Sequence, residues 1–275
     1  MRLVAGIDCG SGFTKAILLG QNGASIFSVM GKGRSRSGIN MEEAAQAALQ
    51  AALRDGGVTR DLVHYVAATG FGRYGVSFRD IQITEITSGA RGVHYLYPNS
   101  RCLIDIGGQS TRAIILHDSG KVHTFKTNDK CAAGSGMFIT RAAKYLEISI
   151  EEVGPLSLGA TNPQPISSVC AVLAESEIIN HVSAGVSVEN ILRGIHESLA
   201  DRAVGMLRRA GMAGEITLIG GVARQSGLVK ALEEKLATKV NVPQDCDYVC
   251  ALGAALLGHK RLANKGSTKD LQQVS

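Results

Sequence analysis

The chain has 275 residues, of which 45% are hydrophobic, and it contains 33 glycines, no tryptophan and few other aromatic residues. This composition is typical of an α/β protein with many tight turns, and it excludes a disordered chain or a disulfide scaffold. The N-terminal apolar run is too short for a signal peptide, and no apolar run reaches the about 18 residues of a membrane helix. We therefore expect a cytoplasmic protein with no membrane partner and with reduced cysteines.

The net charge of +5 does not by itself indicate a nucleic-acid partner. Four cations lie between His259 and Ser275, where only Asp270 opposes them, so the rest of the chain is close to neutral. Aromatic residues are also too sparse to stack bases. We expect no nucleic-acid binding, and a solvated, frayed C-terminal tail.

The N-terminal part predicts a hairpin, a helix and a strand, in that order. Residues 3–7 and 15–20 are short apolar runs separated by a glycine-rich turn, which is typical of a β-hairpin. The alanine-rich run that follows Asn40 predicts a helix ending at Gly56, with Asn40 as its cap and Glu43 placed as in a capping box. Residues 62–69 then predict a strand that leads into a turn at residues 70–73.

The first hairpin is repeated 97 residues later. IDCGSGFTKAI at residues 7–17 reappears as IDIGGQSTRAI at residues 104–114, and each copy is an apolar strand, a glycine-rich turn and a second apolar strand. The repeat predicts a duplicated fold with two related domains facing one another.

The remaining residues alternate between helices and strands. Helices are predicted at 134–147, 171–183, 190–211, 227–238 and 248–262, and a strand at 215–221. Strands that alternate with helices over short links indicate an α/β protein.

Each copy of the repeat places an aspartate at the end of a strand, before a glycine turn. Turn N–H groups can point at phosphate oxygens, glycines let the backbone approach closely, and the carboxylate can hold hydrated Mg²⁺. Two such turns could clamp one triphosphate between them, with Asp8 and Asp105 at Mg²⁺ and Lys15 on phosphate. Whether Arg112 binds phosphate or is a surface cation stays open. The other phosphate-binding candidates are Gly10, Ser11, Gly12, Phe13, Thr14, Gly107 and Gly108.

A third element, Gly220-Gly221, ends the predicted strand 215–221 and leaves room for a flat adenine ring. No Gly-x-x-x-x-Gly-Lys-Ser/Thr occurs, which argues against a P-loop enzyme. The order of phosphate turn, phosphate turn and Gly-Gly resembles the actin/sugar-kinase/Hsp70 superfamily. This resemblance implies two ribonuclease-H-like domains with a nucleotide cleft between them. We expect the first domain at 1–97 plus about 250–275, and the second at 98–249.

Two of the six cysteines stand at predicted helix starts. Cys131 precedes the helix 134–147, and Cys170 precedes the helix 171–183. A helix N-terminus lowers the pKa of a thiol, which favours a metal-ligand role, although each could instead be a buried apolar residue. Cys9 and Cys102 are predicted to be core residues.

Seven segments together resemble one family closely. They are GIDCGSGFTK, TGFGR, ITEITSGARG, DIGGQS, NDKCAAGSGMF, SSVCAVLAESEI and GGVAR. They resemble the activator component of 2-hydroxyacyl-CoA dehydratases, an ATPase family that includes the ATP-hydrolysing subunits of benzoyl-CoA reductase. The resemblance runs from residue 3 to about 258. The chain departs from the family pattern at Ser88, Gly89, Ser110, Met137 and Leu173, and none of these departures removes a candidate ligand.

The resemblance implies a homodimer that shares one [4Fe-4S] cluster, with Cys131 and Cys170 of each subunit as ligands. ATP hydrolysis with Mg²⁺ would drive a low-potential electron, supplied by a ferredoxin or flavodoxin, into a dehydratase or reductase partner. Such a cluster needs four thiolates, and a two-fold dimer of this chain supplies four. A cluster within one chain would need Cys246 and Cys250 as well, and this alternative stays open. Gln109 would orient the attacking water.

Two other functions fit the nucleotide motifs. One is a small-molecule kinase of the N-acetylhexosamine type, with Asp105 as its base and no metal cluster. The other is a regulatory ATPase without redox chemistry, whose cysteines are merely buried. Iron and acid-labile sulfide would distinguish all three.

Overall fold

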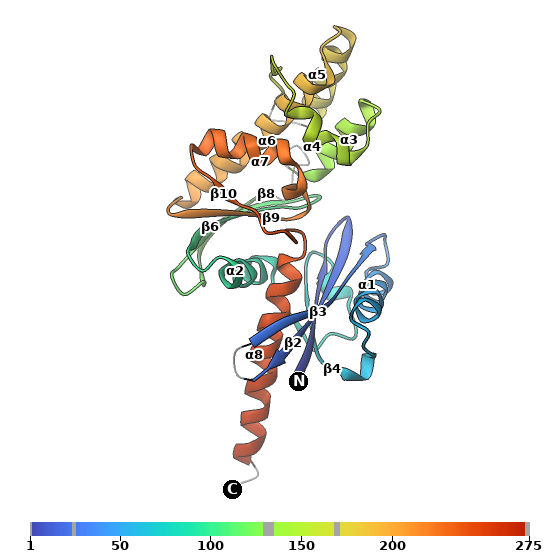
Figure 1. Cartoon of the computed structure of the whole chain (residues 1–275), viewed down its shortest axis with the longest axis vertical. Coiled ribbons are helices and arrows are strands. Elements are labelled where there is room, and N and C mark those ends of the chain that lie inside the picture. Colours follow the sequence, from blue (N-terminus) through green and yellow to red (C-terminus); the bar gives the residue numbers. More distant parts are fainter. Residues whose placement is uncertain (1, 24–25, 129–134, 168–170, 273–275) are drawn as a thin grey trace. The chain divides into compact units, whose positions relative to one another are not determined.

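Two sets of short apolar strands, each beginning with a hairpin, form two five-stranded sheets in the computed structural model of the chain (Figure 1). The structure describes residues 2–23, 26–128, 135–167 and 171–272. It divides into unit 1, Met1–Pro98 with Tyr248–Ser275, and unit 2, Asn99–Asp247.

Unit 1 contains the sheet with strand order β3-β2-β1-β4-β5, in which β1, β2 and β3 are antiparallel neighbours and β4 lies parallel to β1. Its strands are β1 (Arg2–Cys9), β2 (Phe13–Asn22), β3 (Ile26–Arg36), β4 (Val63–Thr69) and β5 (Ile81–Gln82). Its helices are α1 (Met41–Gly56), η1 (Arg60–Leu62), η2 (Arg73–Gly75), α2 (Glu85–Leu96) and α8 (Val249–Gln272).

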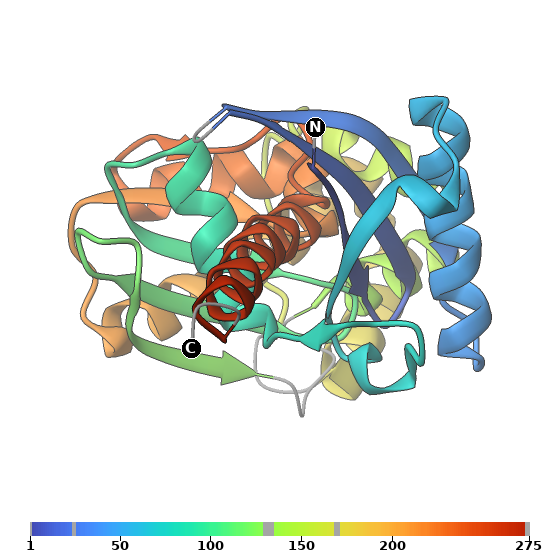
Figure 2. The ribbon, with the colours of Figure 1, turned by 90° about the horizontal axis from the view of Figure 1, so that it is seen from below.

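The sheet of unit 1 is covered on both faces, by α1 on one and α8 on the other (Figure 2). The helix predicted after Asn40 is confirmed: the Asn40 side chain accepts hydrogen bonds from the first-turn amides, and α1 is followed by a left-handed Gly57. Buried alanines of α1 pack against Leu18, whereas Ile17 and Leu19 pack against alanines of α8. The alternation along β2 therefore fixes which face each side chain meets.

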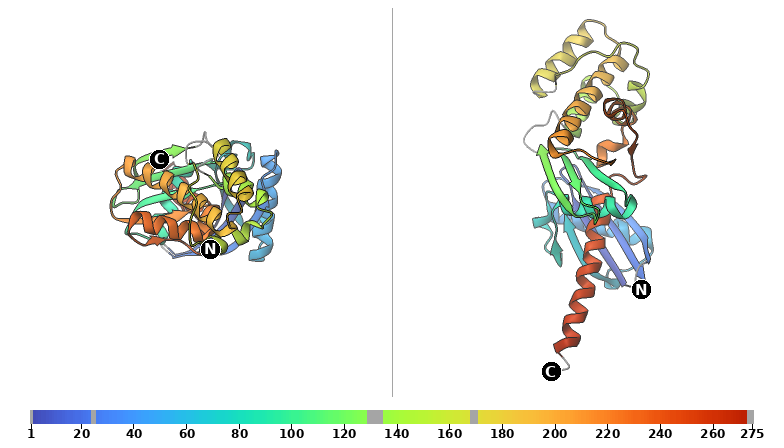
Figure 3. Two further views of the ribbon diagram at one scale, coloured as in Figure 1. Left: turned by 90° about the horizontal axis from the view of Figure 1, so that it is seen from above. Right: turned by 90° about the vertical axis from the view of Figure 1, so that its left-hand side faces the viewer.

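Helix α8 corrects the prediction of a frayed tail. It continues to Gln272, well past the expected end at residue 262, and Figure 3 shows it projecting beyond the strands of its own sheet. No proline interrupts residues 249–275. The buried His259 also anchors the helix, because its Nε2 lies 2.8 Å from the carbonyl oxygen of Leu19. Within the described residues, no helix has both the length and the hydropathy needed to span a membrane.

Unit 2 repeats the topology of unit 1, with strand order β10-β9-β6-β7-β8. Its strands are β6 (Ser100–Ile106), β7 (Thr111–Leu116), β8 (Val122–Asn128), β9 (Glu215–Ile219) and β10 (Val240–Asn241). Its helices are α3 (Gly136–Tyr145), α4 (Ile150–Ser157), α5 (Ala171–Ser183), α6 (Val188–Ala210), η4 (Gly221–Arg224) and α7 (Ser226–Leu236). The predicted α/β fold is therefore confirmed, although α4, β8 and β10 of this unit and α2, β3 and β5 of unit 1 were not predicted.

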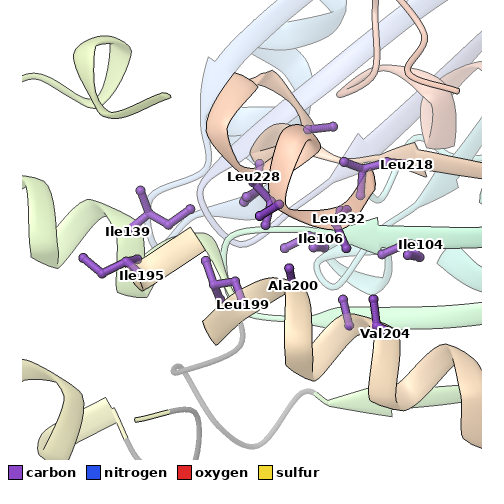
Figure 4. Close-up of a cluster of buried hydrophobic side chains, with 14 of the residues drawn as sticks. Ile104, Ile106, Ile139, Ile195, Leu199, Ala200, Val204, Leu218, Leu228 and Leu232 are labelled. Carbon is purple, nitrogen blue, oxygen red and sulfur yellow. The ribbon is translucent and has the colours of Figure 1, made fainter. Parts of the chain in front are cut away.

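The largest hydrophobic core packs helices onto β6 and β9 (Figure 4). Ile104 and Ile106 of β6 are fully buried in it, together with Leu218 of β9 and Leu199 of α6. Truncating such a side chain typically costs about 2–5 kcal/mol. Asp105 lies between the two isoleucines, so the core that holds them also holds the position of its carboxylate.

We predict that Gly253→Ala destabilises the protein, whereas Gly205→Ala does not. A Cβ at Gly253 in α8 would collide with the carbonyl of Ser88 in α2, which should lower the free energy of unfolding by about 2 kcal/mol or more. At Gly205 in α6 the nearest atom would be the flexible end of Arg209, at 3.4 Å, so alanine should be neutral or stabilising by about 0.5–1 kcal/mol. Urea unfolding followed by circular dichroism measures both. A Gly253→Ala midpoint equal to that of the wild type would contradict the close packing of the two helices.

Candidate functional site

The hairpin of unit 1 holds Asp8 and Lys15 together at its turn. Antiparallel pairing of β1 and β2 places the two residues directly opposite one another, and Lys15 Nζ lies 3.6 Å from Asp8 Oδ2. Asp8 is only 9% exposed. The lysine therefore stabilises a largely buried carboxylate at the place where the backbone turns.

Ser37 braces this turn, and sequence analysis did not identify it. Its hydroxyl donates to the carbonyl of Gly10 at 2.5 Å, and its backbone N–H donates to the carbonyl of Gly12 at 3.1 Å. The buried hydroxyl of Thr14 lies 3.0 Å from that of Ser37. The Thr14 side chain thus supports the turn from behind, and Gly10, Ser11 and Gly12 form its partly exposed surface.

The hairpin of unit 2 repeats the arrangement. Asp105 lies opposite Arg112, whose Nη1 is 3.0 Å from Asp105 Oδ2, and both side chains are largely buried. Arg112 is therefore not a plain surface cation but the partner of the candidate Mg²⁺ ligand. Gly107 and Ser110 close the turn with a hydrogen bond of 2.8 Å, and Gln109 is exposed at its tip.

A left-handed glycine presses against each aspartate. Gly70 follows β4 with φ 91°, and Gly220 follows β9 with φ 93°. A Cβ would lie 2.6 Å from Asp8 Oδ1 at Gly70 and 2.8 Å from Asp105 Oδ1 at Gly220. Only glycine combines this φ with so close an approach. Gly70 is thus the unit 1 counterpart of Gly220. Sequence analysis identified Gly220 but did not recognise this role of Gly70.

The loop after Gly70 is attached to the same strand end. The N–H of Gly72 donates to the carbonyl of Cys9 at 2.9 Å. Arg73 donates to the carbonyl of Gly70 and to Glu85 of α2, both at 3.0 Å, and its guanidinium stacks on Tyr74. These contacts fix the loop beside Asp8.

In unit 2, α3 begins directly on the phosphate-turn candidate. The N–H groups of Gly136 and Met137 donate to the carbonyls of Gly107 and Gly108, at 2.9 and 2.8 Å. These bonds satisfy amides that a helix N-terminus otherwise leaves unpaired. A displacement of the turn must therefore move or strain the start of α3.

Helix α3 is in turn linked to α5 through one carboxylate. Arg141 Nη1 lies 2.9 Å from Glu175 Oε1, and the Tyr145 hydroxyl donates to Glu175 Oε2 at 3.2 Å. Glu175 belongs to α5, whose described residues begin at Ala171, immediately after Cys170. A connected path therefore runs from the Gly107-Gly108 turn through α3 to α5.

The Gly-Gly element lies beside the Asp105 turn. The N–H of Gly220 donates to the carbonyl of Cys246 at 2.9 Å, which fixes the end of β9. Gly221 is exposed, and a Cβ there would meet nothing within 4 Å. Unit 2 thus brings Asp105, Gly107 and Gly220 together on one edge of its sheet.

The four cysteines in the described residues are buried and form no disulfide: Cys9, Cys102, Cys246 and Cys250. Burial, with a smaller effect of Asp8, raises the pKa of Cys9 to about 12. Burial and, next, Asp247 raise the pKa of Cys246 to about 11, and burial raises the pKa of Cys102. Because a metal ligand must be a thiolate, these are poor ligands. Cys9 and Cys102 are core residues, as predicted.

The two predicted cluster ligands, Cys131 and Cys170, lie outside the described residues. Among the residues that are described, no group of three or more His, Cys, Asp or Glu side chains could hold a metal ion.

The profile of the BadF/BadG/BcrA/BcrD ATPase family matches residues 5–258. The activator of lactoyl-CoA dehydratase from Anaerotignum propionicum is 41% identical over 262 residues, which cover 94% of this chain and 98% of the relative. The activating ATPase of (R)-2-hydroxyglutaryl-CoA dehydratase from Acidaminococcus fermentans is 35% identical over 263 residues, which cover 94% of this chain and 97% of the relative. One of the subunits of benzoyl-CoA reductase from Thauera aromatica is 39% identical over 287 residues, which cover 100% of this chain and 99% of the relative.

Solved structures agree with these similarities. The activator of 2-hydroxyisocaproyl-CoA dehydratase from Clostridium difficile, with bound ADPNP, matches with a TM-score of 0.89 at 36% identity over 98% of each chain. A ROK-family glucokinase from Streptomyces griseus matches with a TM-score of 0.57 at 13% identity over 94% of this chain and 99% of that one, which shows the fold alone. The chain therefore has the actin/sugar-kinase/Hsp70 fold and is an ATPase of the BadF/BadG/BcrA/BcrD family.

Proposed function

We propose that the chain is a homodimeric iron-sulfur ATPase that uses ATP hydrolysis to drive one low-potential electron into a 2-hydroxyacyl-CoA dehydratase or a related reductase. One repeated observation supports nucleotide binding in this proposal. In each unit an aspartate ends a strand, a cation lies opposite it, and a left-handed glycine lies against its carboxylate. The names of the relatives, activators of dehydratases and a component of a reductase, support the choice of partner. The electron donor would be a ferredoxin or flavodoxin.

Each turn has a distinct role in this proposal. Asp8 and Asp105 organise Mg²⁺ and its water, Lys15 binds phosphate, and the exposed Gln109 orients the attacking water. The remaining positions shape the nucleotide site: Gly10, Ser11, Gly12, Phe13 and Thr14 in the first turn, Gly107 and Gly108 in the second, and Gly220 and Gly221 at the adenine. We propose that units 1 and 2 are the two actin-like domains and that they clamp one nucleotide between these turns.

The cluster proposal rests on which thiols remain available. The four cysteines among the described residues are buried, and burial raises the pKa of three of them, which disfavours those three as ligands. The family resemblance assigns the ligand role to Cys131 and Cys170, two thiols for a cluster that needs four. A second copy related by a two-fold axis would supply the other two, which supports one [4Fe-4S] cluster per homodimer. The cluster would supply a one-electron carrier of low potential.

The path from the Gly107-Gly108 turn through α3 to α5 supports coupling of ATP to the cluster. Nucleotide binding at the turn would alter the start of α3, and Glu175 would transmit that change to α5, next to Cys170. A ligand shifts a conformational equilibrium only by as much as its affinity differs between the states. ATP has one phosphate more than ADP and would contact more of the two turns, so ATP would shift the helices further.

Iron and acid-labile sulfide, measured on anaerobically purified protein, test the proposal against its rivals. One cluster per two chains is expected. Protein that hydrolyses ATP but holds neither iron nor sulfide would instead be the regulatory ATPase, and protein that phosphorylates a sugar without iron would be the kinase.

We predict that Asp8→Asn and Lys15→Ala each lower kcat/KM for Mg·ATP hydrolysis by about 100-fold or more, because metal and phosphate contacts are worth several kcal/mol. Steady-state phosphate release measures this. Asp61→Ala, which removes an exposed carboxylate of unit 1, is the control and should behave as the wild type. Wild-type hydrolysis in Asp8→Asn would remove Asp8 from the Mg²⁺ site.

We predict that Cys131→Ser and Cys170→Ser each lose most bound iron, whereas Cys102→Ser and Cys246→Ser retain it. A serine hydroxyl must deprotonate against a much higher pKa than a thiol to serve as a ligand. Iron content and visible absorbance, with circular dichroism to confirm folding, measure the outcome. If Cys246→Ser lost iron as fully as Cys131→Ser, a cluster within a single chain would be the better description.

We predict that Glu175→Ala keeps its iron, but that the rate at which a chelator removes the cluster no longer depends on the bound nucleotide. In the wild type, an iron chelator should remove the cluster at different rates with ATP and with ADP, and in Glu175→Ala the two rates should converge. Glu151→Ala, an exposed position in the first turn of α4, is the control. Rates in Glu175→Ala that still differ as in the wild type would show that coupling bypasses the contact between α3 and α5.

A further inference from the structure

The two faces of strand β3 carry different kinds of residue. On the face toward α1 it presents Gly31 and Gly33, where any Cβ would collide with the backbone of that helix. On the opposite face it presents Lys32, Arg34 and Arg36, all exposed. The glycines are explained by close helix packing. The three cations, which we call the cationic strip, are not needed for that packing.

The three residues of the cationic strip are exposed, although aromatic rings of unit 1 contact them. Helix α8 packs on the same face of the sheet, mainly against residues of β1, β2 and β4, and it reaches the edge strand β3 at Phe27, near the opposite end of β3 from the strip. Val29 lies on the same face and is 48% exposed. The strip is therefore an accessible surface of mixed basic and apolar character.

Aromatic rings hold the cations in place. The guanidinium of Arg34 lies 3.7 Å from the ring centroid of Phe13, and that of Arg36 lies 5.9 Å from it. The ammonium of Lys32 lies 6.0 Å from the ring centroid of Tyr248. Such contacts restrict long side chains that would otherwise be mobile, so less entropy is lost when they bind an anion.

The strip also places like charges next to one another. Antiparallel pairing puts Arg34 directly opposite Lys15, and Arg36 directly opposite Phe13. Like charges in opposite positions destabilise a sheet. Asp8 offsets Lys15, but in the described part of the chain neither Arg34 nor Arg36 forms an ion pair. Binding of an external anion would relieve this repulsion.

We propose that the cationic strip is the docking surface for an acidic segment of the dehydratase or reductase partner, an inference that rests on the proposed function. Successive cations lie two residues apart on a strand, about 7 Å, which matches acidic side chains on alternate positions of an extended segment. Complementary charge of this kind raises the association rate and weakens with salt. The strip extends along β3 from Arg36, beside the turn that contains Gly10, to Lys32. It is therefore longer than the phosphate chain of a nucleotide.

The test uses the full-length protein with ADPNP bound, so that the nucleotide site is already filled. Binding of a fluorescent polyglutamate peptide is followed by anisotropy at low and at physiological ionic strength. Arg34→Glu/Arg36→Glu should weaken binding by about tenfold or more at low salt and flatten its salt dependence. Lys121→Glu/Lys126→Glu changes the net charge equally at exposed positions of unit 2 and should bind as the wild type does.

Several outcomes would overturn the proposal. Unchanged peptide binding in Arg34→Glu/Arg36→Glu would show that the strip does not bind the acidic segment. Its charges would then serve only to keep the edge strand from pairing with another chain, a role that glutamates can also perform. An equal loss of peptide affinity in both double variants would mean that the net charge of the protein, and not the strip, determines binding. Tighter binding of single-stranded DNA than of the peptide, lost in the same variant, would indicate nucleic acid.

A second measurement separates this proposal from the proposed function. In a mixture with a 2-hydroxyacyl-CoA dehydratase component, ATP and a low-potential reductant, the strip variant should need about tenfold more protein for half-maximal dehydration at low salt. Its iron content should match the wild type. Because Arg34 lies opposite Lys15 and contacts Phe13, ATP hydrolysis without partner is measured for each protein, and activation is compared at equal rates of hydrolysis. Wild-type activation by the strip variant would overturn the docking surface alone, whereas absence of iron from every variant and the wild type would overturn the proposed function.

Discussion

The candidate site depends on one constraint: a carboxylate at the end of a strand has to be held partly buried while the backbone turns next to it. In both units a cation directly across the hairpin stabilises the charge, and a left-handed glycine from the neighbouring parallel strand leaves room for the carboxylate oxygen. A side chain at Gly70 or Gly220 would displace Asp8 or Asp105. The same two features therefore set the position of each aspartate and the accessibility of each turn.

The strand order follows from this constraint. The aspartate strand needs an antiparallel neighbour to supply the cation and a parallel neighbour to supply the glycine, and β1 and β6 each lie between two such strands. Each parallel neighbour has to be reached by a crossover. In unit 1 that crossover contains α1, and in unit 2 it contains α3, α4, α5 and α6. The sheets can thus remain alike while the crossovers differ.

The sequence predicted what depends on neighbouring residues. The hairpins and the helix capped by Asn40 are local, and the repeat at a spacing of 97 residues revealed the two turns. The pairing of Asp8 with Lys15 was not predicted and follows from the register of the hairpin. Gly70 and Gly220 are 150 residues apart, because the crossover of unit 2 is longer, so a search at constant spacing could not relate them. Ser37 was missed because its contacts with Gly10 and Thr14 form only after β3 pairs with β2. Helix α4 is short and contains Pro155, although Ser149 and Glu152 form a capping box that signals its start.

The unequal crossovers also explain how one copy of a duplicated fold could gain a second function. Cys131 and Cys170 both belong to the long crossover of unit 2, between β8 and β9. In that crossover α3 starts on the carbonyls of Gly107 and Gly108, so residues added there remain tied to the turn. The crossover of unit 1 instead packs α1 closely on the glycines of β3 and leaves the opposite face of that strand to Lys32, Arg34 and Arg36. In our proposals unit 2 therefore carries the redox group, and unit 1 carries the charges that recruit the electron acceptor.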